Sequence, residues 1–286
     1  RPTPPVSARP RGLSVTRIER LIRDPYAIYA QYVLKIYPLD RLNMPPDARG
    51  RGTAIHQALE QFEYAAGQDD PDQLLGLLEE ALLAAGESRA DLIGLRDRRR
   101  AVVADYIDWR AQIAPPFMGQ PLTEAYGKIE LMVKGAPFKL SATADRIERR
   151  PDGRLAILDF KSGAPPSERQ VRSGLAPQMP LQGLIAQKGG WNGAGLPAAP
   201  VSELTYIRFG TQFDVREIGA GGRGQDAVTA AELIDETEAR LVALLAQFAT
   251  PDHPYLSAPR PERVSYWSDY TRLARRDEWA GLGTYD

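Results

Sequence analysis

Cysteine is absent from the 286-residue chain, and histidine occurs only twice. Without cysteine the protein can form no disulfide, no iron–sulfur cluster and no cysteine zinc site, and it has no cysteine nucleophile. The two histidines lack a convincing serine partner, and no Gly-x-Ser-x-Gly segment occurs, so serine hydrolase chemistry is excluded as well.

Long apolar runs and phosphate-binding glycine loops are also missing. No stretch approaches the run of about 20 apolar residues that a membrane span requires. Neither a signal peptide nor an anchor is visible, so we expect a cytoplasmic protein. A Gly-x4-Gly-Lys-Ser/Thr loop and a dinucleotide fingerprint are absent, so we do not expect this chain to hydrolyse ATP. The net charge of −1 gives no overall attraction for nucleic acid, but residues 1–54 hold ten Lys or Arg against four Asp or Glu and could contact phosphates.

The start of the chain differs in composition from the rest. Residues 1–12 are rich in proline and lack an initiator Met, which indicates a linker within a longer protein. We therefore predict a Pro-rich linker over 1–12 and a single domain over 13–286. The remaining sequence alternates between helix-like and strand-like patterns, which predicts an α/β fold with helices around a small mixed β-sheet.

Two segments in the middle of the chain predict a pair of strands that bring acidic and basic groups together. Ala144-Asp145-Arg146-Ile147 is followed by the turn sequence Arg150-Pro151-Asp152-Gly153 and then by Leu158-Asp159-Phe160-Lys161-Ser162-Gly163. Pro presets one turn dihedral and Gly accepts a positive one, so a hairpin is expected. Alternation along the second strand places Asp159 and Lys161 on one face and Phe160 on the other, under a covering helix.

Two carboxylates beside an amine suit metal-dependent phosphodiester cleavage. Divalent ions prefer oxygen ligands, and an attacking water beside them must be held and relieved of a proton. The alternative interpretation is an ordinary ion pair on a solvated strand face. Taken alone, an Asp-x-Lys pair favours this alternative.

A histidine and a glutamine add to this group of side chains. His56 belongs to a polar stripe that runs beside an apolar stripe on a helix around residues 55–62, and a neutral imidazole there is either a metal ligand or a half-buried surface group. Gln178 begins a second helix and shares a face with Gln182. Thr16 and Glu19 fit a capping box at the start of an earlier helix.

The order of these motifs resembles a known family. A glycine-flanked His, then Asp, then Asp-x-Lys, then a helix that begins with Gln is similar to the nuclease domain of the RecB-like branch of the PD-(D/E)xK superfamily. With the opening residues 13–26, the block at 51–56 and the block at 159–163, the chain most resembles the carboxy-terminal nuclease domain of the AddB subunit of AddAB-type helicase–nucleases. The resemblance spans roughly residues 13–275. It implies a restriction-endonuclease-like core with a small mixed β-sheet, flanking helices and additional helical insertions.

The resemblance also implies roles for individual residues. His56, Asp145, Asp159 and the backbone carbonyl of Phe160 would bind Mg²⁺ or Mn²⁺, and Lys161 would position or activate the attacking water. Asp145, Asp159, Lys161 and Gln178 would form the catalytic set. Gln182 stands where relatives have a tyrosine, so the Gln-x3-Tyr motif is only half kept.

The function that follows from the resemblance is a DNA nuclease. It would act as an exonuclease or endonuclease in double-strand-break processing and recombinational repair, on single strands that a helicase motor produces, beside a partner subunit of the AddA type. The alternative is a catalytically silent DNA-end-binding or subunit-docking module with the same fold, which the halved glutamine motif favours.

Many relatives carry four cysteines that hold an iron–sulfur cluster, and this chain has none. We expect Tyr266, Trp267 and Tyr270 to replace that cluster by packing against the helices that follow Thr16. The competing interpretation is an aromatic tail that packs on a partner subunit.

Overall fold

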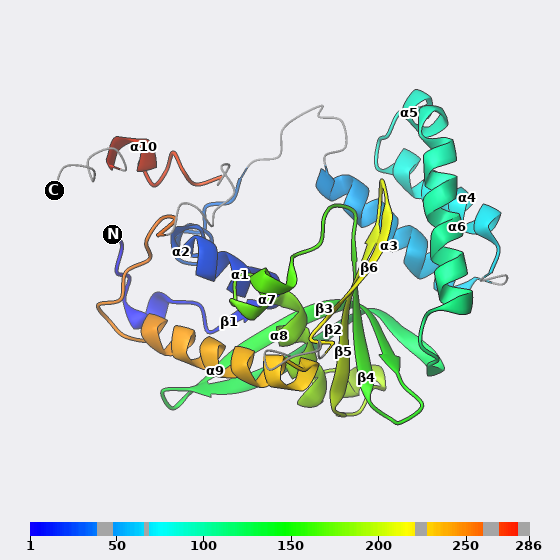
Figure 1. Ribbon diagram of the computed structural model, residues 1–286. Helices are drawn as coiled ribbons and strands as arrows, with labels where there is room; N and C mark the ends of the chain where they lie inside the picture. The colour runs from blue at the N-terminus through cyan, green and yellow to red at the C-terminus, as the bar shows by residue number, and fades with distance from the viewer. Residues whose placement is uncertain (39–47, 66–68, 221–227, 260–268, 280–286) are drawn as a thin grey trace.

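A six-stranded mixed β-sheet forms the centre of the protein in the computed structural model (Figure 1). The structure describes residues 1–38, 48–65, 69–220, 228–259 and 269–279. The strands are β1 (Gly12–Ser14), β2 (Met118–Val133), β3 (Ala136–Arg149), β4 (Leu155–Lys161), β5 (Val201–Phe209) and β6 (Phe213–Ile218). Their order is β1-β3-β4-β5-β6, and β2 pairs with β3.

Neighbouring strands run in both directions. The pairs β2–β3, β3–β4 and β5–β6 are antiparallel, whereas β1–β3 and β4–β5 are parallel. The predicted hairpin between β3 and β4 is confirmed: Arg150 N donates to Arg154 O at 2.8 Å, and Gly153 adopts φ 86° in the turn. The parallel pairs β1–β3 and β4–β5 give the sheet its mixed character.

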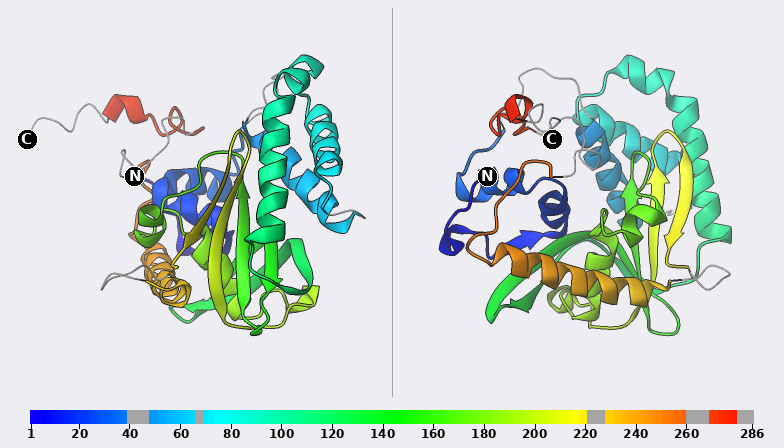
Figure 2. Two further views of the ribbon diagram at one scale, coloured as in Figure 1. Left: turned by 45° about the vertical axis from the view of Figure 1, so that its right-hand side comes forward. Right: turned by 60° about the vertical axis from the view of Figure 1, so that its left-hand side comes forward.

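One face of the sheet is covered by α1 (Val15–Arg23), α8 (Gln178–Gln187) and α9 (Ala230–Phe248) (Figure 2, left). Leu155 and Ile157 of β4 point into this layer, where they are fully buried. Asp159 continues the same face, because side chains two residues apart share a side of a strand. Apolar residues therefore anchor β4 directly below its acidic end.

The other face is covered by a helical insertion. It comprises α3 (Ala48–Tyr64), α4 (Pro71–Ala84), α5 (Arg89–Gly94) and α6 (Arg96–Gln112), which gather on the opposite side of the sheet from α9 (Figures 1 and 2). Leu158 and Phe160 are buried under these helices, as their alternation with Asp159 predicts.

Short elements complete the described fold. They are η1 (Val6–Ala8), α2 (Pro25–Ile28), η2 (Tyr29–Val33), α7 (Glu168–Arg172), η3 (Asn192–Ala194) and α10 (Arg276–Trp279). Among the described residues, no helix combines the length and the apolar character that crossing a membrane would require.

The capping box predicted at Thr16 and Glu19 is wrong. Helix α1 begins at Val15, and Ser14 is its N-cap, since the Ser14 hydroxyl accepts a hydrogen bond from Arg17 N at 3.3 Å. Ser14 is also the last residue of β1, paired with Ser141 of β3. The end of that strand fixes where the helix starts, and Glu19 instead pairs with Arg23 one turn further along α1.

The two ends of the described chain contact one another. Arg9 is buried and donates to the carbonyl oxygen of Phe248, the last residue of α9, at 2.7 Å. Tyr270 is buried against Ala27 and Ala30. Tyr266 and Trp267, which we expected to pack in the same way, lie outside the described residues.

Candidate active site

The acidic residues lie where β3 and β4 diverge. Backbone pairing between these strands begins at Arg146 and Leu158, and beyond that pair the Asp145 carboxylate accepts the Phe160 N–H at 2.8 Å. This hydrogen bond fixes Asp145 beside the end of β4. Asp159 is fully buried, and its Oδ2 lies 2.5 Å from Lys161 Nζ.

His56 reaches this point from the helical layer. Its Nε2 lies 3.0 Å from the Phe160 carbonyl oxygen, and its Nδ1 lies 3.6 Å from Asp145 Oδ2. Helix α3 thus brings the imidazole from a segment about ninety residues earlier to the two residues that the hairpin presents. The predicted convergence of His56 with the hairpin is seen directly in these distances.

Glu124 is a member of the cluster that the sequence did not reveal. Its Oε1 lies 3.2 Å from His56 Nδ1. Its neighbours Thr123 and Ala125 pair with Arg146 and Ala144, which leaves Glu124 across from Asp145. Glu124 has φ 44°, in the left-handed region that costs a non-glycine residue roughly 1–3 kcal/mol. No sequence signal marks it, because the segment has only the ordinary alternation of a strand.

Gln178 contacts both Asp159 and Lys161. As the first residue of α8 it donates from Nε2 to Asp159 Oδ1 at 2.7 Å, and its Oε1 accepts from Lys161 Nζ at 3.3 Å. Its amide therefore bridges the carboxylate and the amine. Gln182, one turn further along α8, is fully buried and donates to the Thr143 carbonyl oxygen at 3.2 Å.

Two further groups face Asp159 and were not anticipated for this site. Tyr206 of β5 is paired with Asp159 in the parallel ladder and is fully buried, and burial and the charge of Asp159 raise its pKa. Glu19 of α1 forms an ion pair with Arg23 at 2.9 Å. Burial raises the pKa of Glu19, against the opposing effects of Arg23 and of the nearby Lys161.

Proton affinities in the cluster are shifted strongly. Burial lowers the pKa of His56, but the hydrogen bond to Glu124 and the charges of Asp145 and Glu124 outweigh it and raise the pKa to about 9. Burial and the neighbouring charge of Asp159 raise the pKa of Asp145 to about 7. Burial lowers the pKa of Lys161, and the charge of Asp159 more than offsets this, so its net pKa is raised. Lys161 is therefore held as a cation.

The donor set fits a hard divalent ion. Ligand atoms of His56, Glu124 and Asp145 all lie within 4.8 Å of one another, and the Phe160 carbonyl oxygen adjoins His56 Nε2. Carboxylate and carbonyl oxygens with one imidazole are ligands that Mg²⁺ and Mn²⁺ accept. Because Nδ1 faces Glu124, Nε2 is the ring nitrogen available to an ion on the Phe160 side.

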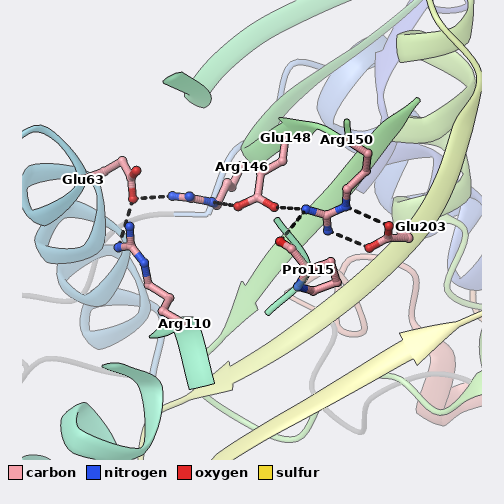
Figure 3. Close-up of polar contacts among 7 residues, drawn as sticks. All are labelled: Glu63, Arg110, Pro115, Arg146, Glu148, Arg150 and Glu203. Atoms are coloured by element: carbon pink, nitrogen blue, oxygen red, sulfur yellow. Dashed lines mark hydrogen bonds and ion pairs between the residues drawn. The ribbon is translucent and has the colours of Figure 1, made fainter. Parts of the chain in front are cut away.

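A buried ion network joins the helix that carries His56 to the strand that carries Asp145 (Figure 3). Glu63 of α3 accepts hydrogen bonds from Arg146 of β3 and pairs with Arg110 of α6 at 3.2 Å. The chain of contacts continues along β3 and into β5, through Glu148, Arg150 and Glu203. Arg150 also donates to the carbonyl oxygen of Pro115.

Comparison with protein families identifies this arrangement. The family model of the PD-(D/E)XK nuclease superfamily matches residues 12–260. The chain belongs to this superfamily. The segment Asp159-Phe160-Lys161 has the residue pattern that the name of the superfamily abbreviates as (D/E)XK. The mixed sheet with helices on both faces is its restriction-endonuclease-like fold.

Individual relatives of this PD-(D/E)XK nuclease domain share less than a third of its residues over the aligned region. It is 28% identical over 215 residues to "Uncharacterized protein RT0391" of Rickettsia typhi, covering 70% of this chain and 24% of the relative. It is 28% identical over 176 residues to a subunit of an ATP-dependent helicase/deoxyribonuclease of Streptococcus mutans, covering 60% and 16%. The chain thus spans less than a quarter of the length of these curated relatives.

A solved structure, "Crystal structure of SSO0001", overlaps 83% of this chain and 75% of that one with a TM-score of 0.32 at 15% identity.

Proposed function

We propose that this chain is a Mg²⁺- or Mn²⁺-dependent deoxyribonuclease domain. Its main substrate is single-stranded DNA ends, which it cleaves by hydrolysis. The observation that carries the proposal is the convergence of His56, Asp145 and the Phe160 carbonyl at the end of β4, next to the group formed by Asp159, Lys161 and Gln178. A structural ion pair on a solvated face would require neither the histidine nor the glutamine.

In this proposal His56 Nε2, Asp145, Asp159 and the Phe160 carbonyl hold the ion, and Glu124 orients the imidazole through Nδ1. When bound, such an ion polarises the scissile phosphate and lowers the pKa of a coordinated water. Lys161, held by Asp159 and Gln178, directs its ammonium group at the attacking water or at the charge that develops on phosphate. Cleavage is hydrolytic and leaves no covalent enzyme intermediate.

The wider role we propose is end processing in double-strand-break repair and recombination, beside a helicase partner subunit of the AddA type. Support comes from the relative in Streptococcus mutans, whose name joins a helicase with a deoxyribonuclease, and from the small share of it that this chain spans. The absence of cysteine from this chain excludes the iron–sulfur cluster found in many relatives.

The experiment that tests the proposal is cleavage of an end-labelled single-stranded oligonucleotide with Mg²⁺ or Mn²⁺. Lys161→Met should lower the rate by about 10²–10³, because the loss is of a charge-stabilising group. Thermal unfolding checks that the variant, in which the buried Asp159 loses its cation, is still folded. Arg154→Met, which removes an exposed cation far from the site, is the matched control.

The opposite outcome would be a wild-type chain with no metal-dependent cleavage, alone or with its partner subunit. That result would favour the silent docking module, for which the burial of Gln182 against β3 is the supporting observation.

A further inference from the structure

The long strands β2 and β3 bury one face of their hairpin and expose the other. Ile129, Leu131 and Val133 of β2 are buried in the core that includes α8 and α9. Since side chains alternate along a strand, the residues between them point away from that core. These outward positions on the two strands, called the β2–β3 face below, are Tyr126, Lys128, Glu130, Lys139, Ser141 and Thr143.

The β2–β3 face leads directly to the candidate metal cluster. Tyr126 pairs with Thr143 across the two strands. Two residues along from this pair lie Glu124 and Asp145, which both belong to the cluster. At about 3.3 Å per residue, Tyr126 lies roughly 7 Å from Glu124 along β2, and Lys139 lies roughly 20 Å from Asp145 along β3. A DNA strand whose scissile phosphate is at the cluster can therefore continue along this face.

Tyr126 presents an aromatic ring at the start of the face. The residue is 56% exposed. Hydrogen bonds with Ser141 and Lys139 lower the pKa of its hydroxyl, and Lys139 Nζ lies 5.8 Å from the centre of the ring. These contacts tie the end of the side chain to β3, which leaves the rest of the ring in solvent. A nucleobase can stack on a ring that is held in this way.

Two lysines supply cations for a nucleic-acid backbone. Lys128 follows Tyr126 on the same face of β2, and Lys139 lies on β3; both are exposed. Glu130, the cross-strand partner of Lys139, is the one acidic residue among the six. Gly12 of β1 leaves room for Lys139, because a Cβ atom on Gly12 would lie 2.9 Å from Lys139 Cβ. An exposed ring beside cations is the combination that single-stranded nucleic acids bind.

We propose that the β2–β3 face binds the single-stranded DNA next to the cleaved bond, with a base stacked on Tyr126 and phosphates at Lys128 and Lys139. The inference rests on the proposed nuclease function, because that function makes DNA the partner of a face that begins at the metal cluster. Every base has a ring that can stack, so the face gives affinity without sequence preference. A duplex should bind less tightly, since its bases are already stacked on one another.

Fluorescence anisotropy of a labelled oligo(dT) in EDTA measures binding without cleavage. Tyr126→Leu should weaken binding about tenfold through the loss of one stacked base, whereas Tyr126→Phe should keep most of the affinity because the ring remains. An oligonucleotide of abasic sites keeps the phosphates but has no rings. Wild type and Tyr126→Leu should therefore bind it equally.

The lysines are tested through the salt dependence of binding. Lys128→Gln combined with Lys139→Gln should lower the slope of log Kd against log salt concentration by about 1.4, which is about 0.7 for each phosphate contact. Lys188→Gln is the matched control, because Lys188 pairs with Glu238 of α9 at 2.9 Å and lies outside the β2–β3 face. This control should keep the wild-type slope.

Cleavage of the same oligo(dT) with Mn²⁺ separates this inference from the nuclease proposal. Tyr126→Leu should raise KM and leave kcat nearly unchanged, because a stacked base binds equally in the substrate complex and in the transition state. Binding that depends on Tyr126 without any cleavage would support the face and refute the nuclease proposal.

Wild-type Kd and KM in Tyr126→Leu would overturn the inference, even if the lysine variant binds more weakly, and so would tighter binding of a duplex than of the single strand. Cleavage in either case would leave the nuclease proposal standing. A wild-type chain that neither binds nor cleaves oligo(dT) would refute both.

Discussion

Glu124 contacts His56 at the site while its backbone adopts an unfavourable left-handed conformation. Its φ of 44° turns the carboxylate toward His56 Nδ1, a conformation that glycine would adopt without strain. A carboxylate behind a metal-binding imidazole fixes the tautomer and the orientation of the ring. We therefore infer that the strain at Glu124 is retained for metal binding.

Glu124→Gly should separate stability from function. The change should raise the free energy of unfolding by about 1 kcal/mol through relief of the left-handed backbone. It should also lower Mn²⁺ affinity by roughly 10- to 100-fold, because His56 loses its orienting partner. Urea unfolding and calorimetric titration measure the two effects. Lys134→Gly, which relieves a φ of 49° in the β2–β3 turn, should stabilise without changing affinity. Unchanged metal affinity in Glu124→Gly would show that Glu124 has no part in the site.

His56 also predicts a pH dependence of metal binding. Its pKa is about 9 in the metal-free protein, because the hydrogen bond to Glu124 and the charges of Asp145 and Glu124 outweigh the opposing effect of burial. A metal at Nε2 must displace that proton, so affinity should rise roughly tenfold per pH unit between pH 7 and pH 9. Above pH 9 the curve should level off, because the imidazole is then neutral. Titrations in buffers of different ionisation enthalpy should detect one released proton near pH 8, and a flat profile would exclude His56 as a ligand.

At the scale of elements, two contacts set α3 on β3. His56 and Glu63 lie seven residues apart on α3, two helical turns along the same side, and they meet the adjacent residues Asp145 and Arg146. The first contact joins two titratable groups that a metal would reorganise. The second is a buried ion pair that needs no metal, so it can keep the ligands in place in the metal-free protein.

Glu63→Gln should test that element contact. The substitution removes the negative charge that Arg110 and Arg146 share in a buried environment. It should therefore lower the free energy of unfolding by about 3–5 kcal/mol. Glu236→Gln breaks only the exposed Arg240–Glu236 pair and should cost less than about 1 kcal/mol. Mn²⁺ affinity of the folded Glu63→Gln protein should fall, and an unchanged affinity would mean that α3 is positioned by its apolar contacts alone.

The same elements show what the sequence can predict. The β3–β4 hairpin follows from local chemistry, because Pro151 and Gly153 define the turn and alternation assigns Asp159 and Phe160 to opposite faces. Helix α1 was predicted with the wrong cap, since Ser14 and Thr16 both suit that position and only the pairing of Ser14 with Ser141 decides between them.

Glu124 was beyond local inference for a different reason. Strand pairing sets it across from Asp145, and its positive φ turns it to His56; neither feature has a signature in the residues around it. The contact of Tyr126 with Ser141 likewise depends on the pairing of β2 with β3. Contacts of this kind between distant segments can be predicted from one sequence only through resemblance to a family. His56 and Gln178 were predicted in that way.

At the scale of the whole molecule, the amino-terminal segment and the segment that follows α9 are tied to the same corner of the fold. Arg9 donates to the carbonyl oxygens of Pro4, Phe248, Thr250 and Pro251, and Tyr255 N donates to Pro2 O. Figure 1 shows the amino terminus beside the segment that follows α9. Asp24 adds a buried contact, accepting from Ala258 N at 3.2 Å. These hydrogen bonds join α1, α2 and α9 without any cluster or disulfide.

Arg9→Met tests whether residues 1–12 belong to the folded body or form the linker that their composition predicts. If they belong to it, the variant should lose about 2–4 kcal/mol of unfolding free energy, because several carbonyl oxygens lose their charged donor. Arg11→Met, an exposed cation two residues away, should change stability little. Deleting residues 1–9 should match Arg9→Met in urea unfolding. If the deletion and both substitutions leave stability unchanged, the segment acts as a linker and α9 is held by its apolar face, through residues such as Leu241 and Leu245.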